Sequence, residues 1–231
     1  MEISVIIPVF NEELFIEKTL QAFVELPDIF EVIVVDGGST DNTCELVEKF
    51  ISFPNIKLVR TNNAGRGHQL HEGTLRAGSE VFWFVHADTI PKRESGIQIK
   101  KHLASSEVVG GNFELIFDSE KCWAKLLTWL YPRLRLIGLT YGDSAMFIRR
   151  EVYEKIGGFQ DYPIFEDVDL FRRASKHGRF VTIRFPVVTS SRRFEQRNFG
   201  KTFVGWMILQ ALYWCGVPAR NLSKYYLPIR K

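Results

Sequence analysis

Two short segments near the start of the chain place hydrogen-bond acceptors directly after apolar runs. Their candidate binding residues are Pro8, Asn11, Glu12, Asp36, Gly37 and Ser39. Asp36 can accept a hydrogen bond from a base N–H or a ribose hydroxyl, and the glycines beside it let a ligand approach the backbone closely. The same residues fit a plain turn that Asp36 begins, with Asp41 capping the next helix. On this motif alone, a nucleotide site and a turn are equally good interpretations.

A third segment, residues 63–70, reads NAGRGHQL and places Arg66 between two glycines at the expected start of a helix. A cation in that position suits a base or a diphosphate, so Arg66 and the nearby Gln69 are candidate binding residues. The alternative, a flexible loop with one exposed arginine, would be preferred if the segment stood alone. His68 and His71 are expected to face solvent and receive no metal role.

His86 and Asp88 follow the apolar run at residues 81–85. A carboxylate just past a buried strand can hold a divalent cation, Mn²⁺ or Mg²⁺, against a diphosphate and neutralise the charge of a leaving group. Asp88 is therefore the metal candidate. His86 lies one pleat back on the same side, as a second ligand or a hydrogen-bond donor to the diphosphate. An aspartate here can also be a simple helix cap, although Pro91 makes a cap less fitting.

Carboxylates also begin a predicted helix at residues 166–177, where Glu166, Asp167 and Asp169 follow one another closely. A hydroxyl group that attacks a carbon centre needs a general base to take its proton, and a carboxylate is a suitable one. We assign that role to Asp167, and to Glu166 the positioning of the acceptor or the base. Taken alone, acidic residues in a first helical turn more often complement the helix dipole at the surface.

Arg192 and Arg193 follow a predicted strand at residues 180–188. Guanidinium groups bind phosphate oxygens bidentately, so this pair is a candidate for a diphosphate or an anionic acceptor. The alternative is a solvated basic loop that continues to Arg197.

The elements that must position these residues alternate between strand and helix. Strands are expected at residues 3–9, 30–35, 56–60 and 80–85, with helices between them, the first opened by Asn11. This alternation favours an α/β fold with a mainly parallel sheet flanked by helices on both faces. Ligands of such sheets lie outside the carboxyl ends of the strands, where the polar motifs of this first half fall. The second half is less regular, with strands expected at 108–117, 144–149 and 180–188 and helices at 122–130 and 166–177.

Composition narrows the class of protein. The chain has 231 residues, of which 45% are hydrophobic and 25% charged, and a net charge of +3, too low for general nucleic-acid binding. Three widely spaced cysteines suggest neither a disulfide framework nor a zinc site, which fits a reducing cytoplasm. The N-terminus lacks the features of a secretory signal, so the mature protein is expected to start at Met1. The longest apolar stretch, residues 203–217, is shorter than the ~20 residues that span a bilayer.

Together these motifs resemble family 2 glycosyltransferases, which have the GT-A fold. The matching segments are IIPVFNE at 6–12, VVDGGSTD at 34–41, HAD at 86–88, GGF at 157–159 and ED at 166–167. The resemblance implies an inverting transferase that uses a nucleoside-diphosphate sugar, with Asp36 and Arg66 at the nucleotide, Asp88 on Mn²⁺ or Mg²⁺, and Asp167 as the base. It also implies one GT-A domain at 1–200 and no independent second domain, as in small bacterial stand-alone members.

Within that domain, residues 1–90 are expected to bind the nucleotide sugar and residues 91–200, a smaller mixed region, the acceptor. Residues 201–231 are expected to form an aromatic helical extension. The chain departs from the family pattern at His86, which replaces the first Asp of Asp-x-Asp. It also has SRRF at 191–194 where processive members have Gln-x-x-Arg-Trp, which disfavours a polymerase with a membrane channel.

Other functions remain open at this point. Aromatic stripes at residues 123–131 and 206–214 fit a polyprenyl-phosphate glycosyltransferase at the inner membrane surface, but they fit core packing or a homodimer contact better. A catalytically degenerate nucleotide-sugar-binding protein is favoured only by His86. A nucleotidyltransferase would need a Gly-rich loop after the first strand, where Asn11 and Glu12 stand instead.

Overall fold

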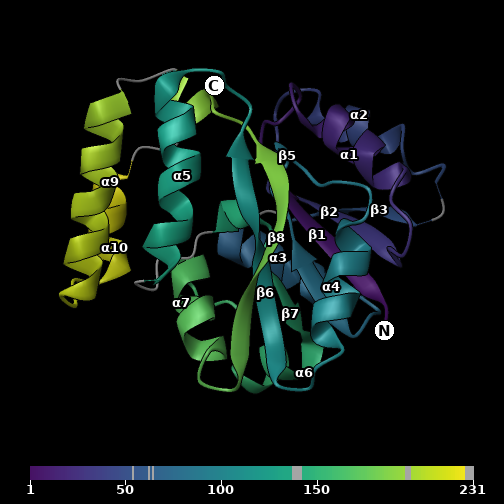
Figure 1. Cartoon of the computed structure of the whole chain (residues 1–231). Helices are drawn as coiled ribbons and strands as arrows, with labels where there is room; N and C mark the ends of the chain where they lie inside the picture. Colours follow the sequence, from purple (N-terminus) through teal and green to yellow (C-terminus); the bar gives the residue numbers. More distant parts are fainter. Residues whose placement is uncertain (54, 62, 64, 137–141, 196–198, 227–231) are drawn as a thin grey trace.

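The computed structural model describes residues 1–53, 55–61, 63, 65–136, 142–195 and 199–226. Within them, one twisted sheet of eight strands has the order β3-β2-β1-β4-β7-β6-β8-β5 (Figure 1). The strands are β1 (Ile3–Val9), β2 (Glu31–Asp36), β3 (Ile56–Arg60), β4 (Val81–Phe84), β5 (Thr89–Ile90), β6 (Val108–Phe117), β7 (Phe147–Arg149) and β8 (Arg179–Thr189). The helices are α1 (Ile16–Val24), α2 (Thr43–Glu48), α3 (Arg66–Thr74), α4 (Ser95–Leu103), α5 (Cys122–Leu136), α6 (Arg150–Lys155), α7 (Glu166–Ala174), α8 (Arg192–Glu195), α9 (Phe199–Trp214) and α10 (Ala219–Leu222).

The first half of the sheet is parallel, as the strand–helix alternation predicted. β1 lies between β2 and β4, and β3 pairs with β2, all in the same direction. The side chains of β1, β2 and β4 are buried on both faces, which explains why these strands read as continuous apolar runs, whereas the edge strand β3 is only partly buried. In this register Val9 lies opposite Asp36, so β1 and β2 end at the same edge.

The second half is mixed. β7 is antiparallel to both β4 and β6, whereas β6 and β8 are parallel. The short β5 then pairs antiparallel with the end of β8, with Thr89 opposite Thr189. This last pairing brings the residues that follow β8 back to the end of β4.

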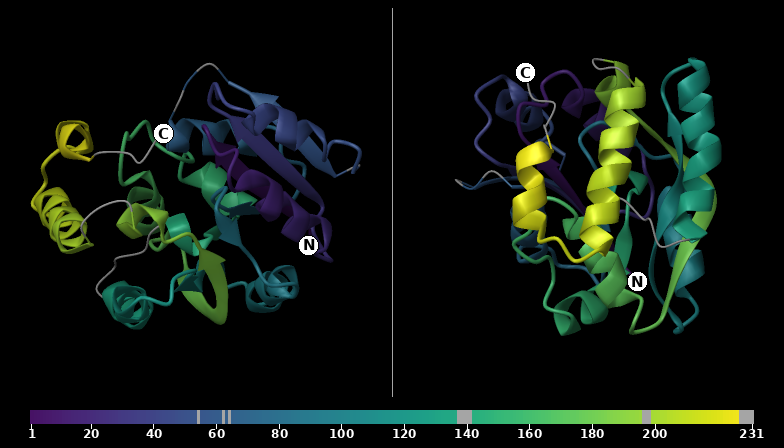
Figure 2. Two further views of the ribbon diagram at one scale, coloured as in Figure 1. Left: turned by 90° about the horizontal axis from the view of Figure 1, so that it is seen from above. Right: turned by 90° about the vertical axis from the view of Figure 1, so that its left-hand side faces the viewer.

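Helices cover both faces of the sheet. Side chains of α1, α2 and α4 share one core with the sheet, and side chains of α3, α6 and α7 share the other. A third core joins α5, α9, α10 and the start of α7 on the side of the molecule opposite α1 and α2 (Figure 2). None of the helices in the described ranges is long and apolar enough to cross a membrane.

Most of the expected elements are present, with some corrections. Asn11 does not open a helix: α1 begins only at Ile16, after a turn in which the Glu12 carbonyl accepts hydrogen bonds from Phe15 and Ile16. The helix expected at 122–130 continues to Leu136 in spite of Pro132. The sequence reading did not include α4, α6 or the two-residue β5. The boundary expected at residue 200 falls inside α9.

Candidate active site

The ends of β1 and β2 are tied together by polar groups of the loops that follow them. Ser39 Oγ accepts a hydrogen bond from the Asn11 amide at 2.9 Å, and Asn11 Oδ1 accepts one from the Thr40 amide at 2.8 Å. The Asp36 carboxylate is 3% exposed and accepts hydrogen bonds from the Gly38 and Ser39 amides. Asp36 therefore begins a turn, as the plain interpretation of this motif held, and that turn lies at the sheet edge.

Two further predicted binding residues lie at the same edge. Pro8 is opposite Val35 in the β1–β2 register. Gln69 is buried, and its side-chain nitrogen donates to the carbonyls of Val9 and Val35, each at 2.8 Å. A Cβ on Gly37 would lie 2.9 Å from the Gln69 amide, so a larger residue there would have to displace the Gln69 side chain. The Gln69 amide nitrogen thus holds α3 onto the sheet, a structural role beyond the binding role that we predicted.

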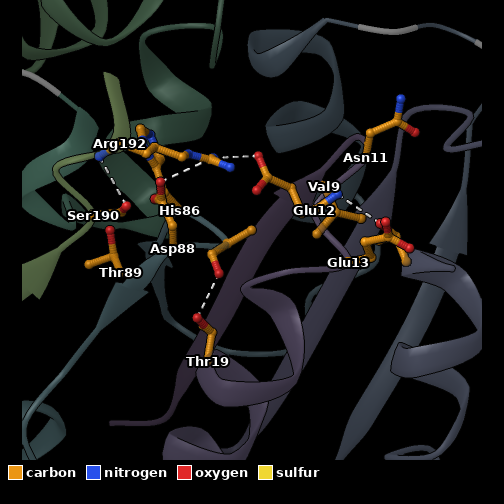
Figure 3. A network of polar contacts seen from close by, with 12 residues as sticks. Val9, Asn11, Glu12, Glu13, Thr19, His86, Asp88, Thr89, Ser190 and Arg192 are labelled. Carbon is orange, nitrogen blue, oxygen red and sulfur yellow. Dashed lines mark hydrogen bonds and ion pairs between the residues drawn. The ribbon is translucent and has the colours of Figure 1, made fainter. Parts of the chain in front are cut away.

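Arg192 reaches across the site between two carboxylates (Figure 3). Its terminal nitrogen Nη2 lies 2.7 Å from Glu12 Oε1 and 3.0 Å from Asp88 Oδ2. The guanidinium also lies over the ring of Phe15, 4.5 Å from the centroid. The Ser190 amide donates to the Asp88 carbonyl at 3.2 Å, and the Ser191 amide donates to Asp118 Oδ1 at 2.6 Å. These two hydrogen bonds hold the backbone just before Arg192.

Burial and the neighbouring charges shift the pKa values of two groups in this cluster. The side chains of Glu12, Asp88 and Arg192 are 17%, 13% and 25% exposed. Burial raises the pKa of Glu12, although the hydrogen bond and charge of Arg192 oppose the rise. Burial alone would lower the pKa of Arg192, but the two carboxylates outweigh it and raise that pKa. Glu12, Asp88 and Arg192 therefore form a partly buried group of three charges, in which the pKa of Glu12 and that of Arg192 each depend on the neighbouring charges.

A second cluster joins the starts of α3 and α7. The Arg66 guanidinium forms ion pairs with Glu166 and, at 3.3 Å, with Asp167 Oδ2, and its Nη1 lies 3.4 Å from His86 Nε2. A Cβ on Gly67 would lie 3.2 Å from the Glu166 side chain, so this glycine lets the two helices approach. In the structure Arg66, which we expected at the nucleotide, pairs with the α7 carboxylates, and its contact with His86 places this cluster next to the end of β4.

The three α7 carboxylates separate into two groups. Asp169 pairs with Arg173, which also donates to backbone carbonyls, so it supports the helix. Glu166 is 2% exposed, and burial raises its pKa in spite of Arg66. Just before it, Phe165 has a positive φ of 64°, unusual for a bulky residue. The stack of Phe165 on Tyr213 of α9, with ring centroids 4.7 Å apart, is consistent with tertiary packing holding this strained entry into α7.

The structure thus brings Glu12, Asp88 and Arg192 together, and Arg66, His86, Glu166 and Asp167 beside them. Two predicted arginines cannot be placed in the site: the side chain of Arg193 and the whole of Arg197 lie outside the part of the chain that the structure describes. Sequence reasoning missed Phe15 and Asp118, which support Arg192, and it noted Gly67 beside Arg66 without its contact with Glu166. No local pattern around Phe15 or Asp118 marks either residue as a neighbour of Arg192. Within the described chain, no group of three or more His, Cys, Asp and Glu side chains could by itself hold a metal ion.

The parallel sheet with this cluster at its carboxyl edge, extended by a mixed second half, defines a GT-A fold. The sequence model of the family described as glycosyl transferase family 2 matches residues 4–157 of the chain. The chain belongs to that family.

The chain is similar to several characterised or named proteins. It is 29% identical over 202 residues to the probable glycosyltransferase YdaM of Bacillus subtilis strain 168, covering 77% of this chain and 47% of that protein. It is 30% identical over 164 residues to the dolichyl N-acetyl-alpha-D-glucosaminyl phosphate 3-beta-D-2,3-diacetamido-2,3-dideoxy-beta-D-glucuronosyltransferase of Methanococcus voltae, covering 65% and 51%. The chain spans about half the length of these relatives.

Among solved structures, the mannosyltransferase PcManGT of Pyrobaculum calidifontis, in complex with GDP-Man and Mn²⁺, matches with a TM-score of 0.67. The two sequences are 25% identical, and the match covers 80% of this chain and 56% of that one.

Proposed function

We propose that this chain is an inverting glycosyltransferase that passes a sugar from a nucleoside-diphosphate donor, with UDP or GDP as the nucleotide, to an acceptor hydroxyl. The observation that carries the proposal is the pair of carboxylate–arginine clusters at the carboxyl edge of the sheet. One contains Asp167, a carboxylate for proton transfer, and the other holds Arg192 between Glu12 and Asp88. The GDP-Man complex of PcManGT supports the donor class.

The donor is expected to lie across the sheet edge. Its base and ribose would lie on the loops after β1 and β2, near Asn11 and Ser39, with Asp36 shaping the turn. Its diphosphate would lie over His86 and Asp88, where Arg192 supplies a charge-matched, bidentate partner. This arrangement follows the rule that ligands of open α/β sheets bind outside the carboxyl ends of the strands.

The residues present fit a divalent cation. Asp88 and Glu12 offer carboxylate oxygens that a cationic nitrogen already bridges, and Glu12 Oε2 is buried with no hydrogen-bond partner among the described residues. Oxygen ligands of this kind suit Mn²⁺ or Mg²⁺. The cation, when bound, would offset the negative charge of the departing diphosphate. His86 would then donate a hydrogen bond to that diphosphate or complete the ligand set.

Asp167 is the proposed general base. The acceptor hydroxyl gives its proton to the Asp167 carboxylate while its oxygen forms a bond to the anomeric carbon, and the bond to the diphosphate oxygen breaks with its electron pair. Attack from the face opposite the diphosphate inverts the anomeric centre. The Asp167 side chain is 8% exposed and that of Glu166 only 2%, so Asp167 is the more accessible. Glu166 positions Arg66, which in turn holds Asp167.

Calorimetric titration with UDP, GDP and their common sugar conjugates, with and without Mn²⁺, tests this proposal. One nucleotide is expected to bind at micromolar concentration only with metal, and Asp88→Ala should lose this metal-dependent binding. Asp167→Asn should leave donor binding within about twofold but reduce release of the nucleoside diphosphate by about 100-fold or more, because it removes only the base. Absence of binding by any nucleotide, or near wild-type release from the Asn variant, would contradict the proposal.

An acceptor at a membrane surface is the second candidate, in line with the polyprenyl-phosphate alternative. The exposed apolar side chains of α5 and α9 include Leu126, Trp129, Val204, Ile208, Leu212 and Trp214. No residue of 202–219 is charged, and the exposed basic residues Lys121, Lys125 and Arg220, each paired with an acidic side chain, lie within or close in sequence to α5 and α9. Exposed apolar and aromatic side chains beside basic residues suit an anionic bilayer surface. The Methanococcus relative, whose name specifies a dolichyl phosphate, supports a lipid-linked acceptor.

A further inference from the structure

One terminal nitrogen of Arg192 lies on the oxygens of two carboxylates at once, 2.7 Å from Glu12 Oε1 and 3.0 Å from Asp88 Oδ2 (Figure 3). The partners come from distant parts of the chain, since Glu12 and Arg192 are 180 residues apart. Both carboxylates are largely buried, so each would be costly without a cation beside it. A single positive charge therefore occupies the position between the two acidic groups of the site.

We propose that Arg192 stands in for the divalent cation when no donor is bound, and that Glu12 is the second carboxylate of the cation site. This inference rests on the proposed function. His86 replaces the first acidic residue of the usual metal motif, which leaves Asp88 as that motif's one carboxylate. Glu12 supplies a second one from the loop after β1, and its Oε2 atom is buried without a partner among the described residues.

The two cations compete because they need the same oxygens. A guanidinium nitrogen and a metal ion cannot both occupy the space between Glu12 Oε1 and Asp88 Oδ2. When metal and donor arrive together, they bring a cation for the carboxylates and a diphosphate for Arg192, so every charge keeps a partner. Metal arriving alone would leave Arg192 without an anion. The site should therefore bind metal poorly until the nucleotide is present.

The local structure suits such an exchange. The backbone before Arg192 is held by the β5–β8 pairing and by the Ser190–Asp88 hydrogen bond. The side chain beyond it rests on the ring of Phe15 without a hydrogen bond to it. The guanidinium can therefore swing from the carboxylates to a diphosphate over His86 while its backbone stays in place. Arg192 would act as a binding residue that also orders the arrival of metal and donor.

The test measures Mn²⁺ binding to the full chain without nucleotide, from the loss of the free Mn²⁺ signal in electron paramagnetic resonance. Arg192→Gln should bind Mn²⁺ at least about tenfold more tightly than the wild-type protein, because the competing cation is gone. In the same variant, binding of the Mn²⁺-nucleotide complex should weaken, because the diphosphate loses its guanidinium. Arg220→Gln removes the same charge from an exposed pair with Asp161 and should change neither value.

Two further variants separate the roles. Glu12→Gln added to Arg192→Gln should remove the gain in Mn²⁺ affinity if Glu12 is a ligand. Arg192→Lys keeps the charge without the bidentate fork and should give intermediate values. Equal Mn²⁺ affinity of Arg192→Gln and wild type would overturn the inference. If the wild type still binds Mn²⁺ together with nucleotide, the proposed function stands; if no variant binds metal or nucleotide, both fail.

Discussion

At the scale of single residues, the Arg66 guanidinium is the counter-ion of a carboxylate that has almost no access to water. Glu166 is 2% exposed and Arg66 36%, so the ion pair lies at the inner wall of the site and is open on the arginine side. Burial raises the pKa of Glu166 from its usual value of 4.5, and Arg66 limits that rise. Whether Glu166 is charged near neutral pH therefore depends on its pairing with Arg66.

Replacing Arg66 by Met should destabilise the protein by about 2–3 kcal/mol at pH 7, somewhat less than a fully buried pair because water screens the guanidinium. The loss of Arg66 raises the pKa of Glu166 further, so the folded state of the variant holds a proton that the unfolded state has released. Stability of the variant should then fall more steeply than that of wild type as pH rises above 4.5.

Urea unfolding between pH 4 and 8 measures this effect. The matched control is Arg60→Met, which removes an arginine from an exposed pair with Glu48 and should cost well under about 1 kcal/mol at every pH. A constant difference between Arg66→Met and wild type across the range would show that Glu166 is not the group responsible.

At the scale of elements, the close packing of α3 on the sheet positions Arg66 and Gln69. A Cβ on Gly73 would lie 2.4 Å from Ile6 Cγ2 and 3.1 Å from Val35 Cγ2, so only a glycine lets α3 approach β1 and β2 this closely. Gly205 in α9, by contrast, has open space around the corresponding position. The two glycines have the same helix propensity and opposite environments.

Gly73→Ala should therefore lower the free energy of unfolding by about 1–3 kcal/mol, because overpacking outweighs the propensity gain. Gly205→Ala should raise it by up to about 1 kcal/mol, because only the propensity term acts. Thermal or urea unfolding of both variants checks the pair. Stabilisation of both variants would mean that α3 can move away from the sheet without cost.

At the scale of the whole molecule, α5, α9 and α10 form a layer on the opposite side from α1 and α2 (Figure 2). Side chains such as Leu127, Tyr131 and Leu209 are buried in this layer, whereas others, including Val204 and Ile208, are exposed. The aromatic stripes are thus partly core, as the favoured interpretation held, and partly an uncovered surface. That surface is the basis for the membrane candidate above.

The protein should co-sediment with vesicles that contain phosphatidylglycerol and much less with neutral phosphatidylcholine vesicles. Both the burial of apolar side chains and the basic residues beside α5 and α9 are expected to contribute to binding. Val204→Ser with Ile208→Ser should weaken the partition by about tenfold or more. Leu14→Ser, at a leucine that is 75% exposed near α1, should not change it. If the protein ignores both vesicles but forms a dimer that the double variant disrupts, the face is a contact between copies.

The sequence by itself determined the parallel half of the fold and the location of its polar motifs. Strands such as those at residues 3–9 and 30–35 can be predicted from the sequence because burial on both faces favours continuous runs of β-branched residues. Asp36 and His86 could be placed at one edge of the sheet for the same reason, since parallel strands end together.

Only the tertiary structure decided which charges meet. Glu12 and Arg192 are 180 residues apart, and Arg66 and Glu166 are 100 apart, so no local pattern records either pair. The two-residue strand β5 brings Arg192 to Asp88, and it is too short to have a periodicity of its own. Local sequence reflects the burial of each element, whereas ion pairs across the site depend on how the elements pack against one another.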